Sequence, residues 1–273
     1  MSVGAQARNF WLMYGRNMRQ LPRIPVVLVF GIVMPVIQLL LFGSLFESIT
    51  KLPAFAAAYP DVNYRAYIAP AILLFTVFVG MATSTAALIV DLRTGYFDKL
   101  RTTPARPWQV IVARLLAEMT RVFSQGLLVL LLSLALGATI ITGPLGALVM
   151  LLLSVFFSGC TAGLAVMALS MKTKSDQATQ SAFPLFFVLL FLSTAFQARE
   201  AMPSWLQTVV KYNPVNYLTE VLRQLMIGVN KNGVMVAEWP VTDMLIVLGV
   251  SLVAAVLLGL LNRRVYRSSV ENR

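Results

Sequence analysis

Residues 91–107, with the sequence DLRTGYFDKLRTTPARP, combine acidic, basic and aromatic side chains in one short segment between two long apolar runs. Tyr96, Phe97 and Leu100 have the i, i+1, i+4 spacing that puts side chains on one face of a short helix, here over residues 93–102. An apolar face on a short charged helix is typical of docking into a groove of a partner protein. The same face fits a helix that rests on lipid headgroups, and the residues alone leave both interpretations open.

The two prolines of this segment predict a rigid connection to the next helix. Pro104 ends the short helix, and Pro107 starts the helix that follows. That second helix is amphipathic, with Arg114, Glu118 and Arg121 on its polar side. A segment built in this way would pass a movement at its docking face directly to a membrane helix.

Motifs of enzymes are absent from the sequence. The chain has no histidine and a single cysteine, Cys160, so a structural zinc site is not expected. No phosphate-binding G-x-x-x-x-G-K-[ST] loop occurs, and neither does a G-x-S-x-G motif, an H-E-x-x-H motif or an evident pair of catalytic carboxylates. We therefore expect no catalytic residues, no metal and no cofactor in this chain, and we expect another protein to supply its energy.

The composition indicates an integral membrane protein. The chain is 58% hydrophobic and 12% charged, whereas soluble domains carry roughly 25% charged residues. Its apolar runs are continuous rather than alternating, which predicts helices and not a barrel. The uncharged run at 122–171 is too long for one crossing and contains the turn signal TGP at 142–144. We therefore predict a single all-α transmembrane domain over residues 1–273 with six spans, at residues 24–46, 66–90, 118–141, 145–171, 177–198 and 243–262.

The charged residues predict the orientation of these spans. With six spans both termini lie on one side, and that side carries 16 basic and five acidic residues, while the other side carries six of each. The whole net charge of +11 therefore falls on one side, which the positive-inside rule places in the cytoplasm. Because these charges flank the spans, the basic character of the chain does not indicate nucleic-acid binding.

The apolar runs contain few polar features. No acidic or basic residue lies within them, which argues against a proton- or ion-coupled carrier and against a voltage sensor. Gln38, Gln125 and Gln180 either form hydrogen bonds between helices or face a substrate path. Gly159 and Gly163 have the spacing that lets helices pack closely, and we expect this packing inside the bundle rather than in a dimer contact.

Residues 5–23 have the pattern of an amphipathic helix at the membrane surface. One face has the 3,4 spacing of a helix and carries Phe10, Met13, Tyr14, Asn17, Met18 and Leu21. Four arginines point elsewhere, namely Arg8, Arg16, Arg19 and Arg23. Such a helix lies in the plane of the lipid headgroups. The alternative is a basic flank that only orients the first span.

A long segment on the outer side precedes the last span. Its pattern predicts a short helix at 204–212, a break at Asn213-Pro214 and a second helix at 215–227 that Gly228 ends. The first helix would carry on one side Trp205, Val209 and Tyr212. The second would have an apolar face with Leu218, Leu222, Leu225 and Met226, and polar positions at Glu220 and Arg223.

Charged residues within this outer segment argue against a seventh span. They are Lys211, Glu220 and Arg223. Two interpretations remain for residues 203–228. We favour re-entrant helices, which enter the membrane and return, and the alternative is a pair of helices that lie flat on the outer surface with their aromatic side chains at the interface.

Two stretches and the overall plan resemble the permease subunits of ABC-2 type transporters, which have the type-V exporter architecture. The stretch at 91–116, DLRTGYFDKLRTTPARPWQVIVARLL, is similar to the coupling segment of that family. The stretch at 202–225, MPSWLQTVVKYNPVNYLTEVLRQL, is similar to its outer region before the last span. Within the family, the pattern looks like that of the daunorubicin-resistance-like drug and lipid exporters. The family often has a glutamate-rich run before the glycine, where this chain has VDLRTG with Asp91 and Arg93.

The resemblance implies a permease subunit without its own ATPase activity that exports an amphipathic lipid, glycolipid or drug across a bacterial cytoplasmic membrane. Two permease chains, identical or different, would pair among the membrane lipids, and two separate ABC ATPase subunits would bind ATP and dock beneath them. The implied ATPase-coupling residues are Arg93, Tyr96, Phe97, Asp98, Lys99, Leu100 and Arg101. The implied outer-gate residues are Trp205, Tyr212, Asn213, Pro214 and Tyr217.

Two other functions compete with this one. A secondary transporter or channel would work without ATP and follow an ion gradient. A membrane enzyme or assembly factor would need no ATPase at all. Co-purification with an ABC ATPase separates the exporter from both alternatives.

Overall fold

The structure is a bundle of helices. The computed structural model describes residues 3–20, 25–51, 53–59, 62–83, 91, 107–175, 177, 183–196, 199, 202–229, 238–266 and 268. Within these residues no β-strand occurs, and the α-helices are α1 (Val3–Gln20), α2 (Pro25–Leu45), α3 (Pro53–Ala58), α4 (Tyr64–Thr83), α7 (Pro107–Ala135), α8 (Gly143–Ser158), α9 (Leu164–Thr173), α11 (Phe183–Phe191), α12 (Ser204–Tyr212), α13 (Pro214–Ile227) and α14 (Val241–Tyr266). A 3₁₀ turn at Glu47–Lys51 precedes α3, and a π-helical turn at Gly159–Gly163 joins α8 to α9. The predicted all-helical class is confirmed.

Four helical stretches among the described residues are long and apolar enough to cross a membrane. They are Tyr64–Ala82, Trp108–Ala135, Gly143–Thr173 and Val241–Tyr266. Two shorter apolar stretches fall in the regions of the other predicted spans, at Gly31–Leu45 and in α11. The count of six spans and the points where the chain enters the membrane stay predictions.

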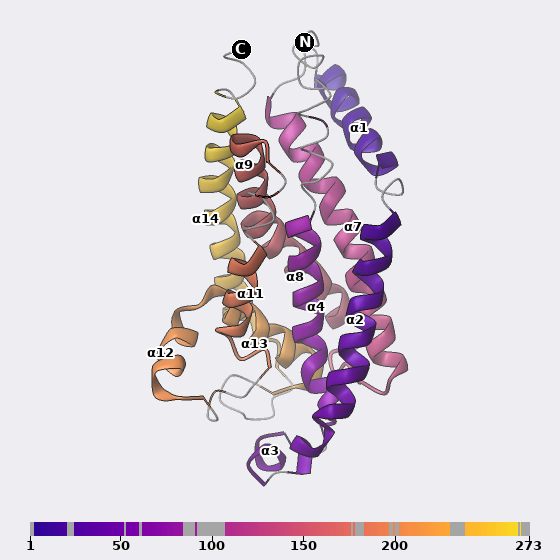
Figure 1. Ribbon diagram of the computed structural model, residues 1–273, viewed down its shortest axis with the longest axis vertical. Helices are drawn as coiled ribbons and strands as arrows, with labels where there is room; N and C mark the ends of the chain where they lie inside the picture. The colour runs from indigo at the N-terminus through magenta and orange to yellow at the C-terminus, as the bar shows by residue number, and fades with distance from the viewer. Residues whose placement is uncertain are drawn as a thin grey trace.

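The two ends of the bundle carry different elements (Figure 1). α1, α9 and the last turns of α14 lie at one end, at the top of Figure 1, and α3 and α12 lie at the other. α1 and the last turns of α14 therefore lie at the same end of the bundle. We call this the α1 end and the opposite one the α3 end.

α4 forms the centre of the bundle. It contacts α2, α7, α8 and α13, and its fully buried side chains include Tyr67, Ile68, Ile72, Leu73 and Leu74. α14 differs from α4, because half of its apolar side chains are exposed, among them Leu252, Val253, Val256 and Leu257. A helix that is apolar on all sides and yet exposed requires lipid or another protein around it.

The π-helical turn lies where three helices approach each other closely. A Cβ atom on Gly159 would lie 3.0 Å from Cγ of Met119, and one on Gly163 would lie 3.1 Å from Cδ1 of Leu115 and 3.3 Å from Sδ of Met81. The two glycines therefore let α8 and α9 pack against α7 and α4. The predicted close packing inside the bundle is confirmed.

The connection between α7 and α8 starts earlier than the turn predicted at 142–144. α7 ends at Ala135, and Gly137 follows in the left-handed region with a φ of +91°. The Gly137 and Ala138 amides donate hydrogen bonds to the carbonyls of Leu134 and Ser133, at 3.0 and 2.9 Å. This is the Schellman arrangement, in which a left-handed glycine satisfies the last carbonyls of a helix.

The conformation of Gly137 gives a direct test of this turn. We expect Gly137→Ala to lower the free energy of unfolding in detergent by about 1–2 kcal/mol, because a Cβ atom disfavours the left-handed conformation. Gly249→Ala is the matched control, since it also adds a methyl group in open space but lies within α14. That change should be neutral or stabilise by up to about 1 kcal/mol. Equal effects of the two changes, measured by chemical unfolding, would contradict the prediction.

Candidate functional site

The predicted coupling segment is described only at its two ends. Residues 92–106, which include every predicted ATPase-coupling residue, lie outside the described residues, and their role stays a prediction. Asp91 precedes them, and Pro107 starts α7 directly after them. The site is therefore built from the groups that hold these two ends.

Asp91 is buried between two arginines from different helices. The guanidinium of Arg16 on α1 donates two hydrogen bonds to the Asp91 carboxylate, at 2.6 and 3.1 Å. Arg114 on α7 approaches the same carboxylate with an N–O distance of 3.6 Å. Because two cations share this one buried carboxylate, Asp91 joins α1 to α7 at the start of the coupling segment.

The ion pairs continue along α7. Glu118 forms ion pairs with Arg114 at 3.3 Å and with Arg121 at 2.9 Å, and all three side chains are buried. Arg121 then donates to the carbonyl oxygen of Gly80 on α4 at 2.6 Å and to Gln125 at 3.3 Å. We call the five charged residues of this series the ion-pair network: Arg16, Asp91, Arg114, Glu118 and Arg121.

The ion-pair network alternates in sign along one side of α7. Its members on α7 have i, i+4 and i+3 spacing, which brings side chains together on one helix face. The sequence pattern did assign Arg114, Glu118 and Arg121 to one polar face. It did not show that this face is buried against α4, because spacing alone does not say what a face contacts.

α1 also holds the far end of the coupling segment. The side-chain amide of Gln109, two residues into α7, donates to the carbonyl oxygen of Gln6 at 3.2 Å. Tyr14 and Thr120 share a hydrogen bond of 3.0 Å between their hydroxyls. These contacts join α1 to α7 along its length, and Figure 1 shows the two helices side by side. Both ends of segment 92–106 are thus bound to α1.

The apolar face predicted for the N-terminal helix contacts protein. Asn17 is buried, and Met13 packs against a cluster that contains Val110 and Ile111 of α7 and Met167 of α9. Trp11 and Leu12 are exposed on another side. α7 supplies both apolar and hydroxyl partners for this face, and the predicted position of the helix in the plane of the lipid headgroups stays a prediction.

The outer segment follows the predicted pattern of helices. α12 and α13 are separated at Asn213, and Gly228 ends α13 in the left-handed region with a φ of +71°. The predicted apolar residues of α13 are completely buried, namely Leu218, Leu222, Leu225 and Met226. α13 contacts α4, α8 and α14, so it is a core element of the bundle.

The predicted outer-gate residues fall into two groups. Trp205 and Tyr212 are exposed on α12, at 63% and 76% of their surface. Asn213 is buried, Pro214 is half-buried, and Tyr217 donates from its hydroxyl to the Lys211 carbonyl at 3.1 Å. The structure does not bring the five side chains together, and a gating role for them stays a prediction.

Two asparagines fix α13 to the turn that follows α11. Asn213 caps α13 by accepting from the Val215 amide at 2.9 Å, and its side-chain nitrogen donates to the carbonyls of Leu189 and Leu192 at 2.7 Å each. Asn216 accepts from the amide and the hydroxyl of Thr194 at 2.9 and 2.8 Å. The backbone groups of this turn are therefore satisfied by side chains of α13.

Arg223 is buried on the same side of α13. Its guanidinium donates to the carbonyl oxygens of Thr194 and Ala195 and lies 4.4 Å from the centre of the Tyr67 ring on α4. The sequence pattern placed Arg223 among the polar positions but did not predict its burial. Its spacing from Asn213 and Asn216, by ten and seven residues, is the signal that puts all three on one face.

Comparisons with known proteins identify the family. A sequence profile described as "ABC-2 type transporter" matches residues 8–227, which is most of the chain. The chain belongs to the ABC-2 type transporter family. Members of this family are the membrane components of transporters and are not themselves catalytic.

Named relatives of this ABC-2 permease cover most of its length. It is 30% identical over 236 residues to "Daunorubicin resistance ABC transporter permease protein DrrB1" of Streptomyces coeruleorubidus, which covers 83% of this chain and 76% of the relative. It is 30% identical over 221 residues to "Putative transport permease ycf38" of Cyanophora paradoxa, over 80% and 74% of the two chains. It is 22% identical over 169 residues to "Probable multidrug ABC transporter permease YbhR" of Escherichia coli K12, which covers 61% of this chain and 45% of the relative.

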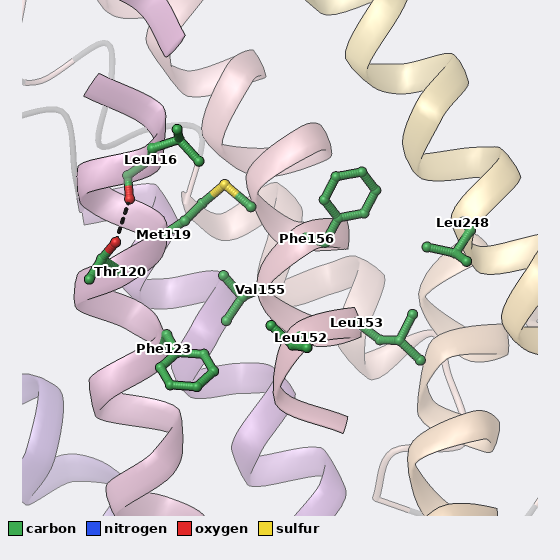
Figure 2. Close-up of a pocket in the computed structure, with 9 residues that line it drawn as sticks. All are labelled: Leu116, Met119, Thr120, Phe123, Leu152, Leu153, Val155, Phe156 and Leu248. Carbon is green, nitrogen blue, oxygen red and sulfur yellow. Dashed lines mark hydrogen bonds between the residues drawn. The ribbon is translucent and has the colours of Figure 1, made fainter. Parts of the chain in front are cut away.

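An apolar groove opens on the surface of this ABC-2 permease between α7, α8 and α14. Its volume is about 480 Å³, and Figure 2 shows its lining side chains: Leu116, Met119, Thr120, Phe123, Leu152, Leu153, Val155, Phe156 and Leu248. The hydroxyl of Thr120 donates to the Leu116 carbonyl at 2.9 Å, so the one polar side chain of the lining is satisfied internally. A groove of this kind suits a hydrocarbon chain.

The structure describes two of the three glutamines that lie in the predicted spans, Gln38 and Gln125. The Gln125 amide lies so close to α2 that a Cβ atom on Gly31 would be 2.0 Å from its nitrogen, and it also contacts Gly80 on α4. Gln125 therefore packs between helices, but among the described residues its side-chain nitrogen has no hydrogen-bond partner and its oxygen accepts from Arg121 of the same helix. Its two predicted roles, a hydrogen bond between helices or a place on a substrate path, stay predictions. Gln38 is half-buried, and its side-chain oxygen has no partner among the described residues. Gln180 lies outside them.

Proposed function

We propose that this chain is the permease subunit of an ATP-driven exporter in a bacterial cytoplasmic membrane, with both termini in the cytoplasm. Two permease chains pair, and separate ABC ATPase subunits bind and hydrolyse ATP. The ATPases contact the helix at 93–102 through the predicted coupling residues. The named relatives support an ABC permease, and the charge distribution supports the orientation.

The ion-pair network carries this proposal. A docking helix transmits force only if its ends are fixed to the elements that must move. Asp91 fixes the first end to Arg16 and Arg114, and Gln109 fixes the second end to α1. A push on the segment would then move α1 and α7 together, and Arg121 would pass that movement to α4.

We further propose that the substrate is an amphipathic lipid, glycolipid or drug. The name of the relative DrrB1 refers to resistance against daunorubicin, a property of that protein. The uncharged groove between α7, α8 and α14 is consistent with an apolar part of a substrate. In this proposal α12 and α13 are re-entrant helices, and the burial of α13 together with the exposure of α12 supports that arrangement.

Co-purification tests the coupling role. The chain is co-expressed with a candidate ABC ATPase, and the wild-type pair should be recovered together in detergent. Replacing Tyr96, Phe97 and Leu100 by alanine should abolish recovery of the ATPase, because the docking face is lost, while the permease still inserts in the membrane. The matched control is Trp239→Ala, which removes an aromatic side chain at the α3 end and should leave docking unchanged.

Two results would count against the proposal. Unchanged docking of the triple alanine variant would mean that segment 93–102 is only a headgroup anchor. Transport that proceeds without ATP and follows a proton or sodium gradient would favour a secondary transporter.

A further inference from the structure

Arg223 is a buried cation whose partners are all neutral. Its residue exposure is 4%, and that of Tyr67 beneath it is 1%. The contacts of the guanidinium are two backbone carbonyls and the face of one aromatic ring. In the part of the chain that the structure describes, no carboxylate pairs with it. This differs from the ion-pair network, in which every arginine contacts an acidic side chain.

Two donor groups at this place have no hydrogen-bond partner in the part of the chain that the structure describes. The Nε atom of Arg223 and the hydroxyl of Tyr67 are both buried, and neither forms a hydrogen bond within the described residues. Buried donors without partners are rare in folded proteins, and each calls for an explanation such as a bound group. Here two of them belong to side chains in direct contact. Together with the charge of the guanidinium, they form a set of donors that suits an anion.

We propose that Arg223 and Tyr67 form a binding site for the anionic headgroup of an amphiphile, a phosphate or a carboxylate, at the α3 end of the bundle. The turn at 192–196 covers this site, because its Thr194 and Ala195 carbonyls accept hydrogen bonds from the guanidinium. The headgroup replaces these carbonyls when the turn moves away. The inference rests on the proposed export function and adds the sign of the substrate's charge.

The exchange of partners is favourable on general grounds. An anion adds the attraction of opposite charges to the hydrogen bonds of the guanidinium, and the planar fork of arginine binds a phosphate with two parallel bonds. Glu220, the nearest acidic residue in sequence, receives a hydrogen bond from Asn216 at 2.7 Å. The guanidinium is therefore available to an external anion once the two carbonyls withdraw.

Binding is tested with synthetic amphiphiles on the full-length chain in neutral detergent. Didecyl phosphate is titrated against thermal unfolding, with didecanoyl phosphatidylcholine as a zwitterionic ligand and didecanoyl glycerol as an uncharged one. The phosphate should raise the unfolding temperature far more than the other two. Arg223→Gln should weaken its binding by about tenfold or more, the loss expected for one hydrogen bond to a charged group. The control Lys211→Gln removes an exposed cation of α12 and should not change binding.

Tyr67→Phe separates binding from stability. The Tyr67 hydroxyl has no hydrogen-bond partner among the described residues, so its removal should leave the unfolding temperature of the free protein unchanged or slightly raised. Its ring remains beneath Arg223. If the hydroxyl donates to a bound headgroup, this variant should bind didecyl phosphate several-fold more weakly. Equal affinity of wild type, Arg223→Gln and Tyr67→Phe, or equal stabilisation by all three ligands, would overturn the inference.

The source of the headgroup is decided by a transport assay. Fluorescent phosphatidylglycerol is placed in vesicles of phosphatidylcholine that contain the chain and its ATPase. ATP-dependent movement of the label between leaflets, lost in Arg223→Gln, would make the anion part of the substrate. Saturable binding without movement would make it a membrane lipid that holds the site. Both results would support the proposed anion site, whereas the absence of anion binding would contradict it.

The same material separates this inference from the proposed function. Arg223→Gln should still co-purify with the ATPase, because Arg223 lies at the α3 end, away from the coupling segment. A wild-type chain that binds didecyl phosphate but no ATPase would contradict the exporter proposal and leave the anion site intact. A chain that binds the ATPase but no anion would contradict the anion site and leave the exporter proposal intact.

Discussion

Glu118→Ala is expected to lower the free energy of unfolding of this permease by about 3–5 kcal/mol, the range measured when one partner of a buried ion pair is removed. Glu118 is the central acid of the ion-pair network and contacts both Arg114 and Arg121. Its removal leaves two buried guanidinium groups without their common carboxylate. The loss is measured by chemical unfolding of the purified chain in detergent. Docking of the ATPase should weaken as well, because Arg114, which links α7 to Asp91, loses its second carboxylate partner.

Three variants accompany this measurement. Glu238→Gln removes an exposed carboxylate at the α3 end and should change stability by less than about 0.5 kcal/mol. Glu118→Gln should lie between wild type and Glu118→Ala, because the amide keeps the shape and one acceptor. Replacing Arg114, Glu118 and Arg121 together by Met, Leu and Met should recover much of the stability, since no uncompensated charge remains. A cost below about 1 kcal/mol for Glu118→Ala would show that the network adds little.

Asn213→Ala is expected to destabilise the chain by about 2–4 kcal/mol. It removes the cap of α13, which is worth about 1 kcal/mol, and it leaves the carbonyls of Leu189 and Leu192 without their side-chain donor. Because Asn213 is also a predicted gate residue, the loss should appear in transport as leakage or failure of closure. Unfolding in detergent and efflux from vesicles measure the two effects.

One substitution separates the capping role of Asn213 from the hydrogen bonds that it donates, and a second one serves as a control. Asn213→Ser keeps a capping oxygen but loses both donated hydrogen bonds, so it should retain the capping part of the stability only. Thr208→Ala removes a side chain on exposed α12 that bonds only within its own helix and should change little. If Asn213→Ala and Thr208→Ala cost the same, the contacts between α13 and the turn at 192–196 do not stabilise the bundle.

The local course of the outer segment was predictable from sequence because its signals are local. A break at Asn213-Pro214 and a stop at Gly228 are set by the conformations that asparagine, proline and glycine allow, and both are found. The apolar face of α13 follows from residue spacing in the same way. No residue outside the segment had to be known for these predictions.

The burial of polar side chains was not predictable in this way. Arg114, Glu118, Arg121 and Arg223 were placed on polar faces, and such faces usually meet solvent. The three arginines find partners on other parts of the chain: Asp91, the Gly80 carbonyl, and the carbonyls of Thr194 and Ala195. Glu118 pairs with Arg114 and Arg121 of its own helix. A sequence read locally does not contain these pairings. The connection between α7 and α8 includes the predicted turn at the TGP motif, where Gly143 has a φ of +66°, but it starts earlier because Gly137 already ends α7.

The attachment of α1 to the coupling segment sets an order for assembly in the cell. α1 leaves the ribosome first, but its partners follow much later, because Arg16 and Asp91 are 75 residues apart and Gln6 and Gln109 are 103 residues apart. α1 can therefore form these contacts only after the chain has been synthesised as far as Gln109, which lies beyond the first two predicted spans. During that interval the basic and aromatic side chains of α1 lack the partners that they have in the folded bundle.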